Sequence, residues 1–258
     1  MQQLDGAPVT LREMQSLAFL GLAHFTTVRV DDGRVKGLGL HLERLATDAR
    51  ALFDVDLDPD LVRRRIREAI ADEPPSVIAR ITVFDPDLRL ERPGADAHPR
   101  ILVTPRPVSA SASPPMRVRS VRFGRQTPEI KHVGLFGALR ERRLAQRAGF
   151  DDAVFVDETG ALSEGPTWNL GFVAGDEIVW PDGAALPGVT RDLLAGAAGG
   201  ASRRVELGDL AAFEAAFITG SGAGVRPLAA IDEVAWPADH PVFARLRVAY
   251  AEIEGAAV

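Results

Sequence analysis

The sequence contains no cysteine, a single tyrosine and no long hydrophobic run. The lack of cysteine excludes disulfides and thiol chemistry, although it does not identify the compartment. No apolar stretch reaches the roughly 18 residues that a membrane-spanning helix needs. The N-terminal residues show no basic start followed by an apolar core, so no signal peptide is visible. We therefore expect a cytoplasmic protein with no membrane partner.

Net positive charge is also lacking. The formal net charge is −6 and the pI is near 5.5, which argues against general nucleic-acid binding. Arginines do cluster within residues 63–67 and 117–125. We interpret the first cluster as the solvent-facing side of a helix and the second as the polar face of a strand. The expected partners are small molecules.

Lysine is the scarcest charged residue, because only Lys36 and Lys131 are lysine among 30 Lys and Arg residues. Lys131 stands between apolar neighbours, after Ile130 and shortly before Val133 and Leu135. Burial lowers the pKa of an amine and leaves it nucleophilic near neutral pH, whereas arginine keeps its proton. A Schiff base with a carbonyl compound requires such an amine. Biased codon usage also explains scarce lysine, so a catalytic role for Lys131 depends on the surrounding motifs.

A Pro-, Ser- and Ala-rich stretch over residues 108–115 predicts a linker that divides the chain. It separates an N-terminal domain, residues 1–107, from a larger C-terminal domain, residues 116–258. In the first domain, alternation predicts strands over 24–30, 34–40, 77–84 and 100–104, with a turn at 31–33. Helical spacing predicts one helix from residue 41 and another over 60–71. The N-terminal domain is therefore predicted as α+β with a largely antiparallel sheet.

The C-terminal domain shows helices and short strands without a repeating βαβ order. Strands are predicted over 116–123, 153–157, 170–174, 177–180 and 216–219, and helices over 133–147 and 210–215. The strands are expected to be antiparallel, and this order fits neither a Rossmann fold nor a TIM barrel.

Three segments of the C-terminal domain suit an anionic aromatic cofactor. Glu164 lies in a tight turn, and a buried carboxylate can keep a pyridine nitrogen protonated. Val189 and Thr190 follow a Leu-Pro-Gly turn at the start of a predicted helix, where free N–H groups favour phosphate. Ser221 and Gly222 belong to a glycine-rich turn with the makings of an anion nest.

Each of these segments also has a simpler reading, as an exposed turn, an ordinary helix start or a flexible loop. The five histidines are scattered, so no metal site is predicted, and His41 is expected to be structural. No Walker sequence or Gly-x-Ser-x-Gly elbow supports an NTPase or a hydrolase.

Taken together, the motifs resemble the class IV aminotransferases, the fold type IV pyridoxal-phosphate enzymes. The resemblance runs from about residue 21 to 232 and is strongest over 130–191. There the lysine, the Glu-Gly-x-x-x-Asn-Leu block from Glu164 and the Leu-Pro-Gly-Val-Thr-Arg segment follow in family order. The His-Leu-Glu-Arg-Leu segment around Arg44 is similar to the family's histidine-x-x-arginine-leucine segment. The resemblance implies an α+β enzyme with a smaller N-terminal α/β sandwich domain and a larger C-terminal pseudo-barrel domain.

The resemblance implies pyridoxal 5′-phosphate as cofactor and a role for each matching residue. Lys131 would hold the cofactor as a Schiff base and move the substrate proton. Glu164 would pair with the pyridine nitrogen, and Leu186 would pack against the ring. The expected phosphate ligands are Arg44, Val189 and Thr190. Ser221 and Gly222 would form the turn that contacts the phosphate or the substrate carboxylate.

The sequence departs from the family's branched-chain branch at Phe136, where that branch carries a tyrosine. The acidic residue that usually precedes the first strand is also missing near Phe25. D-amino acid enzymes bind the substrate carboxylate with an arginine and a histidine after the third strand. Arg80 is another candidate, although it could equally be a partly exposed sheet residue. The expected substrate-binding residues are Phe25, Arg80, Arg89, Arg92, His98 and Phe136.

The resemblance therefore implies a transaminase that moves an amino group to a 2-oxo acid, with D-amino acids or (R)-amines favoured as donors because of Phe136. A lyase similar to aminodeoxychorismate lyase, or a branched-chain aminotransferase, is the alternative. A cofactor-binding protein without catalysis is a third reading. The resemblance also implies a homodimer.

Overall fold

The computed structural model describes residues 2–108 and 114–258, which form two compact units. Among these residues, unit 1 takes 2–108, 130–134 and 254–258, and unit 2 takes 114–129 and 135–253. The two units divide the chain near the predicted linker, of which residues 109–113 lie outside the described part. Two short segments that the sequence analysis placed in the C-terminal domain, 130–134 and 254–258, belong to unit 1.

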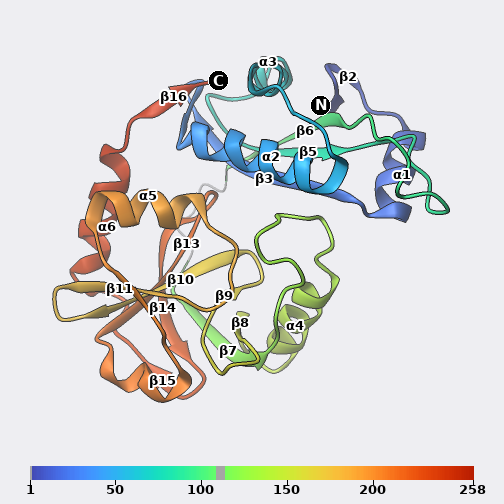
Figure 1. The fold of residues 1–258 in the computed structure, drawn as a ribbon. Helices are drawn as coiled ribbons and strands as arrows, with labels where there is room; N and C mark the ends of the chain where they lie inside the picture. Colours follow the sequence, from blue (N-terminus) through green and yellow to red (C-terminus); the bar gives the residue numbers. More distant parts are fainter. Residues whose placement is uncertain (1, 109–113) are drawn as a thin grey trace. The chain divides into compact units, whose positions relative to one another are not determined.

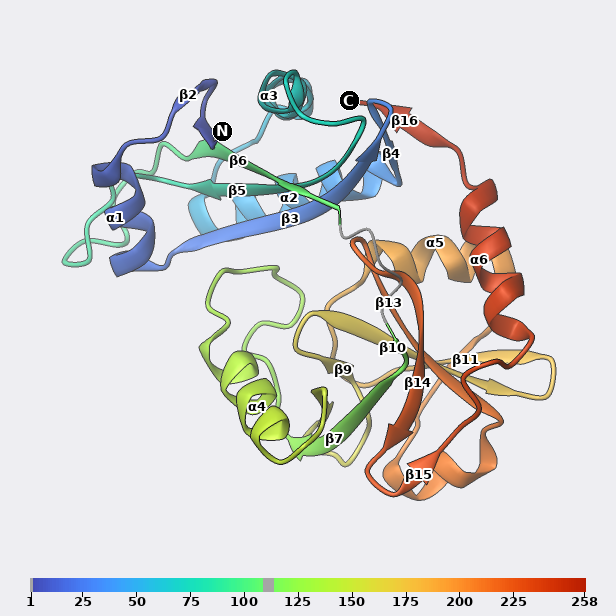
Figure 2. The same cartoon turned by 180° about the vertical axis from the view of Figure 1, so that it is seen from behind.

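Unit 1 is built on one antiparallel sheet, in the order β16-β4-β3-β5-β6-β1-β2. Its long strands, β3, β5 and β6, lie side by side in both views (Figures 1 and 2). The predicted turn joins β3 to β4, where Asp32 and Gly33 take positive φ angles of 49° and 70°. The elements are β1 (Gln3–Leu4), β2 (Ala7–Pro8), α1 (Leu11–Leu20), β3 (Ala23–Asp31), β4 (Arg34–Lys36), α2 (Leu38–Phe53), α3 (Pro59–Ile70), β5 (Ser76–Phe84), β6 (Arg100–Pro107) and β16 (Gly255–Ala257).

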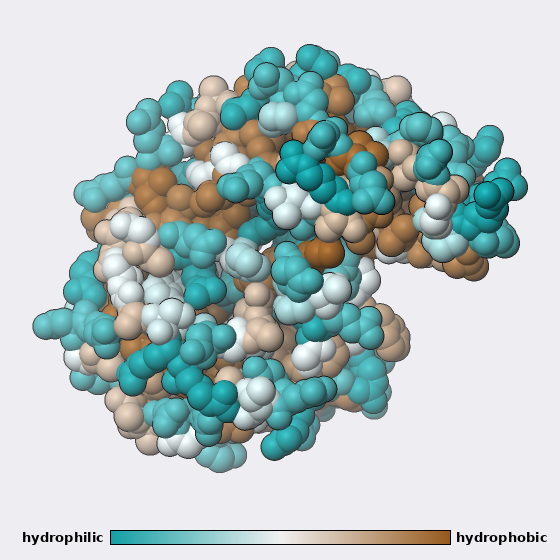
Figure 3. Space-filling view, viewed as in Figure 1, coloured by the Kyte–Doolittle hydropathy of each residue, from teal (hydrophilic) through white to brown (hydrophobic). Residues whose placement is uncertain are grey.

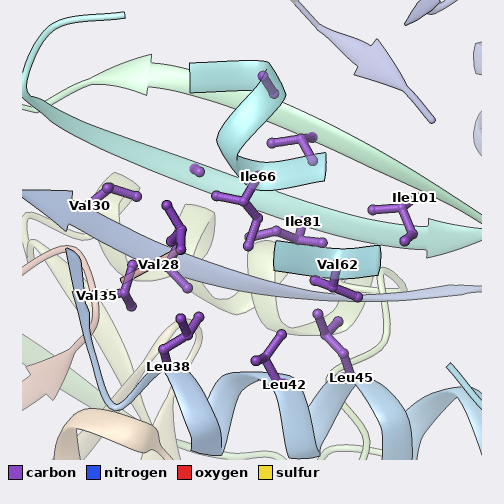
Figure 4. Packing of buried hydrophobic residues seen from close by; sticks show 14 of the residues in the cluster. Val28, Val30, Val35, Leu38, Leu42, Leu45, Val62, Ile66, Ile81 and Ile101 are labelled. Atoms are coloured by element: carbon purple, nitrogen blue, oxygen red, sulfur yellow. The ribbon is translucent and has the colours of Figure 1, made fainter. Parts of the chain in front are cut away.

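The core of unit 1 lies between this sheet and the helices α2 and α3. Alternate residues of a strand share one face, so Val28 and Val30 of β3 meet Leu42 and Leu45 of α2 in one cluster. Figure 4 shows the apolar side chains of α2 directed toward the strands. The opposite face of the sheet carries Phe25 and the even-numbered residues of β5. The sheet therefore has one fully packed face and a second face that carries polar groups.

Unit 2 contains a second sheet, in the order β12-β11-β10-β13-β14-β7-β8, with β9 paired to β10 and β15 to β14. Three pairs, β11/β12, β14/β7 and β7/β8, are parallel, so the expectation of an antiparallel arrangement was wrong there. The elements are β7 (Met116–Arg122), α4 (Phe136–Arg147), β8 (Asp152–Val156), β9 (Glu164–Gly165), β10 (Trp168–Ala174), β11 (Glu177–Pro181), α5 (Val189–Ala198), β12 (Ala201–Arg203), the 3-10 helix η1 (Leu207–Ala212), β13 (Ala215–Gly220), β14 (Gly224–Ile231), β15 (Val234–Ala235) and α6 (Val242–Glu252).

Helices cover the sheet of unit 2 through separate apolar clusters. Leu194 of α5 and Phe243 of α6 pack with Phe217 of β13, and Figure 1 shows the two helices next to each other. Ala138 and Ala145 of α4 pack on β8. The α+β class is confirmed for both halves of the chain.

Several predicted boundaries were wrong. The strand expected over 34–40 ends at Lys36, because α2 already begins at Leu38. The helix expected from Val133 begins at Phe136, because residues 131–133 pair with β3 instead. Local helical spacing was overridden here by a tertiary strand contact. No helix in the described part of the chain is both long and apolar enough to cross a membrane.

Candidate active site

Lys131 lies on a short extended segment at the edge of the unit 1 sheet. The N–H of Phe25 donates to the carbonyl of Lys131 at 2.9 Å, and the N–H of Val133 donates to the carbonyl of Ala23 at 2.9 Å. These bonds make residues 131–133 an antiparallel neighbour of the first residues of β3. The side chain of Lys131 is half-buried, less so than the sequence predicted. A tertiary strand contact thus fixes the backbone of the predicted catalytic lysine.

Two cations lie over the ring of Phe25. The Lys131 Nζ is 5.0 Å from the ring centroid, and the Arg80 Cζ is 3.6 Å from it. The Arg80 Nε donates to the hydroxyl of Thr82 at 3.3 Å. Burial and the charge of Arg106 both lower the pKa of Arg80, burial having the larger effect. In the described part of the chain no carboxylate forms a salt bridge with Arg80, so its charge is available to an anionic ligand.

Buried polar residues lie on the helix side of the same strand. The His41 Nδ1 and the Thr26 hydroxyl are 2.7 Å apart, and His41 is only 2% exposed. Burial, with the charges of Arg44 and Lys131, lowers the pKa of His41 to about 3. Burial alone lowers the pKa of His24 to about 4. Both histidines are therefore neutral at neutral pH.

The other residues predicted in unit 1 lie in two places. Arg44 is half-buried on α2, close enough to His41 for its charge to depress that pKa. Arg89, Arg92 and His98 are exposed on the loop between β5 and β6. Among the described residues, no hydrogen bond or ion pair joins their side chains to the group around Lys131. The structure therefore brings Phe25, Arg80 and Lys131 together.

In unit 2, sheet register places three polar residues in one row. Glu164 of β9 is opposite Asn169 of β10, which is opposite Thr219 of β13. Directly opposed residues of antiparallel strands point to the same face, about 5 Å apart. All three are buried, with exposed fractions of 3%, 7% and 0%. Residues distant in the sequence thus share one polar row on an otherwise apolar sheet.

Asn169 connects this row to the start of α5. Its Nδ2 donates to the Leu186 carbonyl at 2.8 Å. A side chain at Gly188 would collide with the Asn169 Oδ1, so only glycine fits at the N-cap. Within the described part of the chain, no side chain caps α5, and the Thr190 hydroxyl in its first turn is buried with no hydrogen-bond partner. The free N–H groups and this hydroxyl are ready to bind an anion.

The glycine-rich turn joins β13 to β14. Gly220 pairs with Gly224, and the N–H of Ala223 donates to the Gly220 carbonyl at 3.0 Å. Ser221 is half-buried and Gly222 is exposed. The Thr219 hydroxyl, just before the turn, is fully buried and has no partner. The sequence analysis did not select Thr219, although a threonine before a glycine-rich turn was a readable signal.

Arg125 contradicts its interpretation as a strand residue. β7 ends at Arg122, and the Arg125 side chain is 7% exposed with its Nη1 3.4 Å from the Glu164 Oε1. The sequence pattern hid this contact, because Arg125 follows Arg117, Arg119 and Arg122 in a short arginine-rich segment. A buried guanidinium beside Glu164 favours the charged form of that carboxylate. Phe136, at the start of α4, is 83% exposed.

The hairpin that carries Glu164 is anchored by an ion pair between the buried Asp152 and the half-buried Arg142. The Asp152 carboxylate accepts hydrogen bonds from the Arg142 Nε and Nη2 and from the Trp168 Nε1, at 2.8 to 2.9 Å. Arg142 also donates to the Thr167 hydroxyl in the hairpin turn. The ring of Trp168 lies where a side chain at Gly165 would stand. The contacts of Asp152 and Arg142 therefore fix the position of the hairpin that carries Glu164.

We expect Asp152→Ala to destabilise unit 2 by about 3 kcal/mol, because it strands the charge of Arg142 and the indole N–H of Trp168. The measurement is urea unfolding followed by tryptophan fluorescence. Glu158→Ala is the control, since Glu158 is an exposed carboxylate of the same unit. Equal stability of the two variants would contradict this reading.

The two sets of residues match different parts of one ligand class. Unit 1 offers a primary amine next to an arginine without a carboxylate partner, which suits a carbonyl compound bearing an anionic group. Unit 2 offers unpartnered buried hydroxyls at an uncapped helix start, which suit a phosphate, and a buried carboxylate, which suits a protonated ring nitrogen. Each unit by itself therefore offers groups that fit one part of a phosphorylated aromatic aldehyde.

A family model described as amino-transferase class IV matches residues 23–231. The chain belongs to the class IV aminotransferases. Members of this family use pyridoxal 5′-phosphate, and the chain is a pyridoxal-phosphate-dependent aminotransferase of this class. The expected family, enzyme type and cofactor are confirmed. A search of curated protein sequences found no match.

Solved structures of class IV proteins share the fold at low sequence identity. A branched-chain aminotransferase from Thermoproteus uzoniensis with norvaline is 20% identical, covers 97% of this chain and 93% of its own, and has a TM-score of 0.85. The branched-chain enzyme of Escherichia coli is 22% identical, covers 98% and 91%, and scores 0.82. A putative 4-amino-4-deoxychorismate lyase from Legionella pneumophila is 22% identical, covers 92% and 93%, and scores 0.80. At these identities the similarity shows a shared fold alone.

Proposed function

We propose that this class IV aminotransferase moves an amino group from a D-amino acid or an (R)-amine to a 2-oxo acid. The observation that carries the transfer itself is Lys131, a half-buried amine beside an arginine without a carboxylate partner. The donor preference rests on Phe136, which replaces the tyrosine of the branched-chain branch. When bound, pyridoxal 5′-phosphate supplies the aldehyde and the electron-withdrawing ring.

The residues of the chain take distinct roles in this proposal. Lys131 would hold the cofactor through its Nζ and would take the proton from the donor Cα. Glu164 would keep a proton on the ring nitrogen, and the Arg125 guanidinium would favour the charged carboxylate of Glu164. Val189, Thr190, Ser221 and Gly222, with Arg44 of unit 1, are the proposed phosphate ligands, and Leu186 is the proposed ring contact.

Substrate recognition is assigned to the charged face of the unit 1 sheet. The Arg80 guanidinium is held by Phe25 and Thr82 and has no carboxylate partner among the described residues. A guanidinium fixed in this way suits a carboxylate, because it presents paired N–H donors in one plane. Arg80 is therefore the proposed carboxylate-binding residue, and Phe25 positions it. Arg89, Arg92 and His98 stay predictions.

We expect Arg80→Leu to raise the KM for a 2-oxo acid by about 10- to 100-fold, the effect of one charged hydrogen-bonding group. The KM for an (R)-amine should change little, because that donor has no carboxylate. Arg29→Leu is the matched control, since Arg29 is already paired with Asp31 at 2.9 Å. An equal rise in KM for the amine and the oxo acid would contradict the role of Arg80.

The test of the proposed function is a donor screen with 2-oxoglutarate as acceptor. D-alanine, L-leucine and an (R)-amine are offered separately, and the aminated acceptor is measured by chromatography. Transfer from D-alanine or the (R)-amine supports the proposal, and transfer from L-leucine alone would assign a branched-chain aminotransferase. Release of pyruvate from aminodeoxychorismate without transfer would assign a lyase instead.

Two further expectations remain predictions. A homodimer is supported by large apolar side chains that lie exposed on the chain, among them Leu11, Phe19 and Phe136 at 76%, 78% and 83%. Figure 3 shows hydrophobic patches between the hydrophilic residues that cover most of this face of the molecule. Light scattering that shows a fully active monomer would contradict the dimer. A cytoplasmic location is likewise inferred from the sequence.

A further inference from the structure

One buried carboxylate of unit 1 has no role in the proposed chemistry. Asp48 lies on α2 and is 2% exposed. His41, Leu45 and Asp48 follow helical spacing, so they share the face of α2 that packs against the sheet. Aspartate is seldom fully buried unless its carboxylate is paired. We therefore infer the role of Asp48 from the groups that its carboxylate contacts.

One partner of Asp48 is the backbone of Lys131. The N–H of Lys131 donates to the Asp48 Oδ2 at 3.1 Å. A hydrogen bond between an amide and a carboxylate is stronger than one between neutral groups. The other contacts of this segment come from β3, through the Phe25 N–H and the Ala23 carbonyl. Lys131 is thus held by the sheet and by α2 together.

The second neighbour of Asp48 does not compete for the same oxygen. The His24 Nδ1 is 3.9 Å from the Asp48 Oδ2, which is beyond hydrogen-bond distance, and neither ring nitrogen of His24 has a hydrogen-bond partner among the described residues. Burial lowers the pKa of His24 to about 4, so the ring is neutral at neutral pH. A neutral ring attracts the carboxylate weakly, and the oxygen stays directed at the Lys131 amide.

The segment that Asp48 holds is short. Residues 130–134 belong to unit 1, whereas the chain before and after them belongs to unit 2. Few hydrogen bonds of the backbone therefore determine the position of the Lys131 Cα. An error of about 1 Å in the position of a reacting group can lower a rate by about 100-fold.

We propose that Asp48 is a positioning residue: from α2 it fixes the Lys131 backbone, and so the origin of the amine that binds the cofactor. This inference rests on the proposed role of Lys131. It assigns to Asp48 no contact with substrate or cofactor.

The experiment compares Asp48→Leu, Asp48→Asn and Glu43→Gln, each as the full-length holoenzyme. Leucine keeps the branched shape of the side chain and removes the acceptor, asparagine keeps an acceptor oxygen, and Glu43 is an exposed carboxylate on the same helix. We expect Asp48→Leu to lower kcat by about 10- to 100-fold, with little change in the donor KM. Asp48→Asn should recover most of this loss, and Glu43→Gln should match the wild type.

A second readout follows the lysine itself. We expect the pH midpoint of the visible absorbance of the lysine-bound cofactor to shift in Asp48→Leu and to stay in place in Glu43→Gln. Borohydride reduction and peptide mass analysis show in parallel whether Lys131 carries the cofactor. A wild type without label at Lys131 would overturn the proposed function. If the wild type carries the cofactor on Lys131 but has the same kcat and pH midpoint as Asp48→Leu, only the proposed role of Asp48 is overturned.

Amide hydrogen exchange of the wild type covers the case in which Asp48→Leu does not fold. The peptide containing residues 130–134 should exchange as slowly as the β3 peptide, and faster in Asp48→Asn. Exchange of the wild-type peptide at the rate of an open loop would overturn the proposal.

Discussion

Replacing Lys131 with alanine is expected to lower kcat by about 1,000-fold or more, because the change removes the amine proposed to attach the cofactor and to take the donor proton. The visible absorbance of the lysine-bound cofactor should vanish as well. The measurement pairs transaminase kinetics with an absorbance spectrum of the purified variant. Noncovalent cofactor should still bind through the proposed phosphate ligands of unit 2.

The chain supplies its own control, because Lys36 is the only other lysine in the sequence. Lys36 lies on β4, in the same unit as Lys131. Lys36→Ala should retain the absorbance and the activity. With two lysines present, borohydride reduction followed by peptide mass analysis assigns the attachment unambiguously. A reduced cofactor on Lys36, or an active Lys131→Ala variant, would refute the proposed role of Lys131.

Glu164→Gln is expected to lower kcat by about 100- to 1,000-fold, the usual effect of removing one preorganised electrostatic group. A neutral amide cannot keep the ring nitrogen protonated, so electron withdrawal by the cofactor weakens. The measurement is single-turnover kinetics, which isolates the proton-transfer step from product release. The isotope effect of a donor deuterated at Cα should increase, because that step becomes slower.

Two comparisons separate the chemistry of Glu164 from a loss of stability. Glu158→Gln changes an exposed carboxylate of the same unit and should behave as the wild type. Arg125→Leu removes the guanidinium 3.4 Å from Glu164 and leaves the carboxylate in place. We expect its kcat to fall less than that of Glu164→Gln. An unchanged isotope effect in Glu164→Gln would count against the role of Glu164.

Much of the fold could be predicted where a long hydrophobic pattern is complete within one strand or helix. The strand of unit 1 that begins near His24 and the helix that carries Arg44 agree with their predicted periodicity, because one face of each is buried in a single core. The helix α1 was missed because none of its residues is buried. Its capping box, Thr10 with Glu13, was the readable signal.

Other elements could not be predicted from local pattern. The strands β1 and β2 have two residues each and exist through their pairing with β6 and with each other. The parallel pairs of unit 2 join strands distant in the sequence, such as β7 and β14. Such pairings depend on the path of the whole chain, which alternation within one strand does not contain.

The sequence by itself determined the chemistry. A rare lysine in an apolar segment, a glutamate in a tight turn and a Leu-Pro-Gly turn before a helix identified the family and its cofactor, because each is a local arrangement that the chemistry requires. Only the tertiary structure decided which residues contact the lysine and the glutamate or lie in one row with the glutamate. Asp48 reaches the Lys131 amide, Arg125 reaches Glu164, and Thr219 joins the polar row through helix packing, a loop and sheet register. Such contacts join backbone and side chains across distant segments, so no spacing along the chain encodes them.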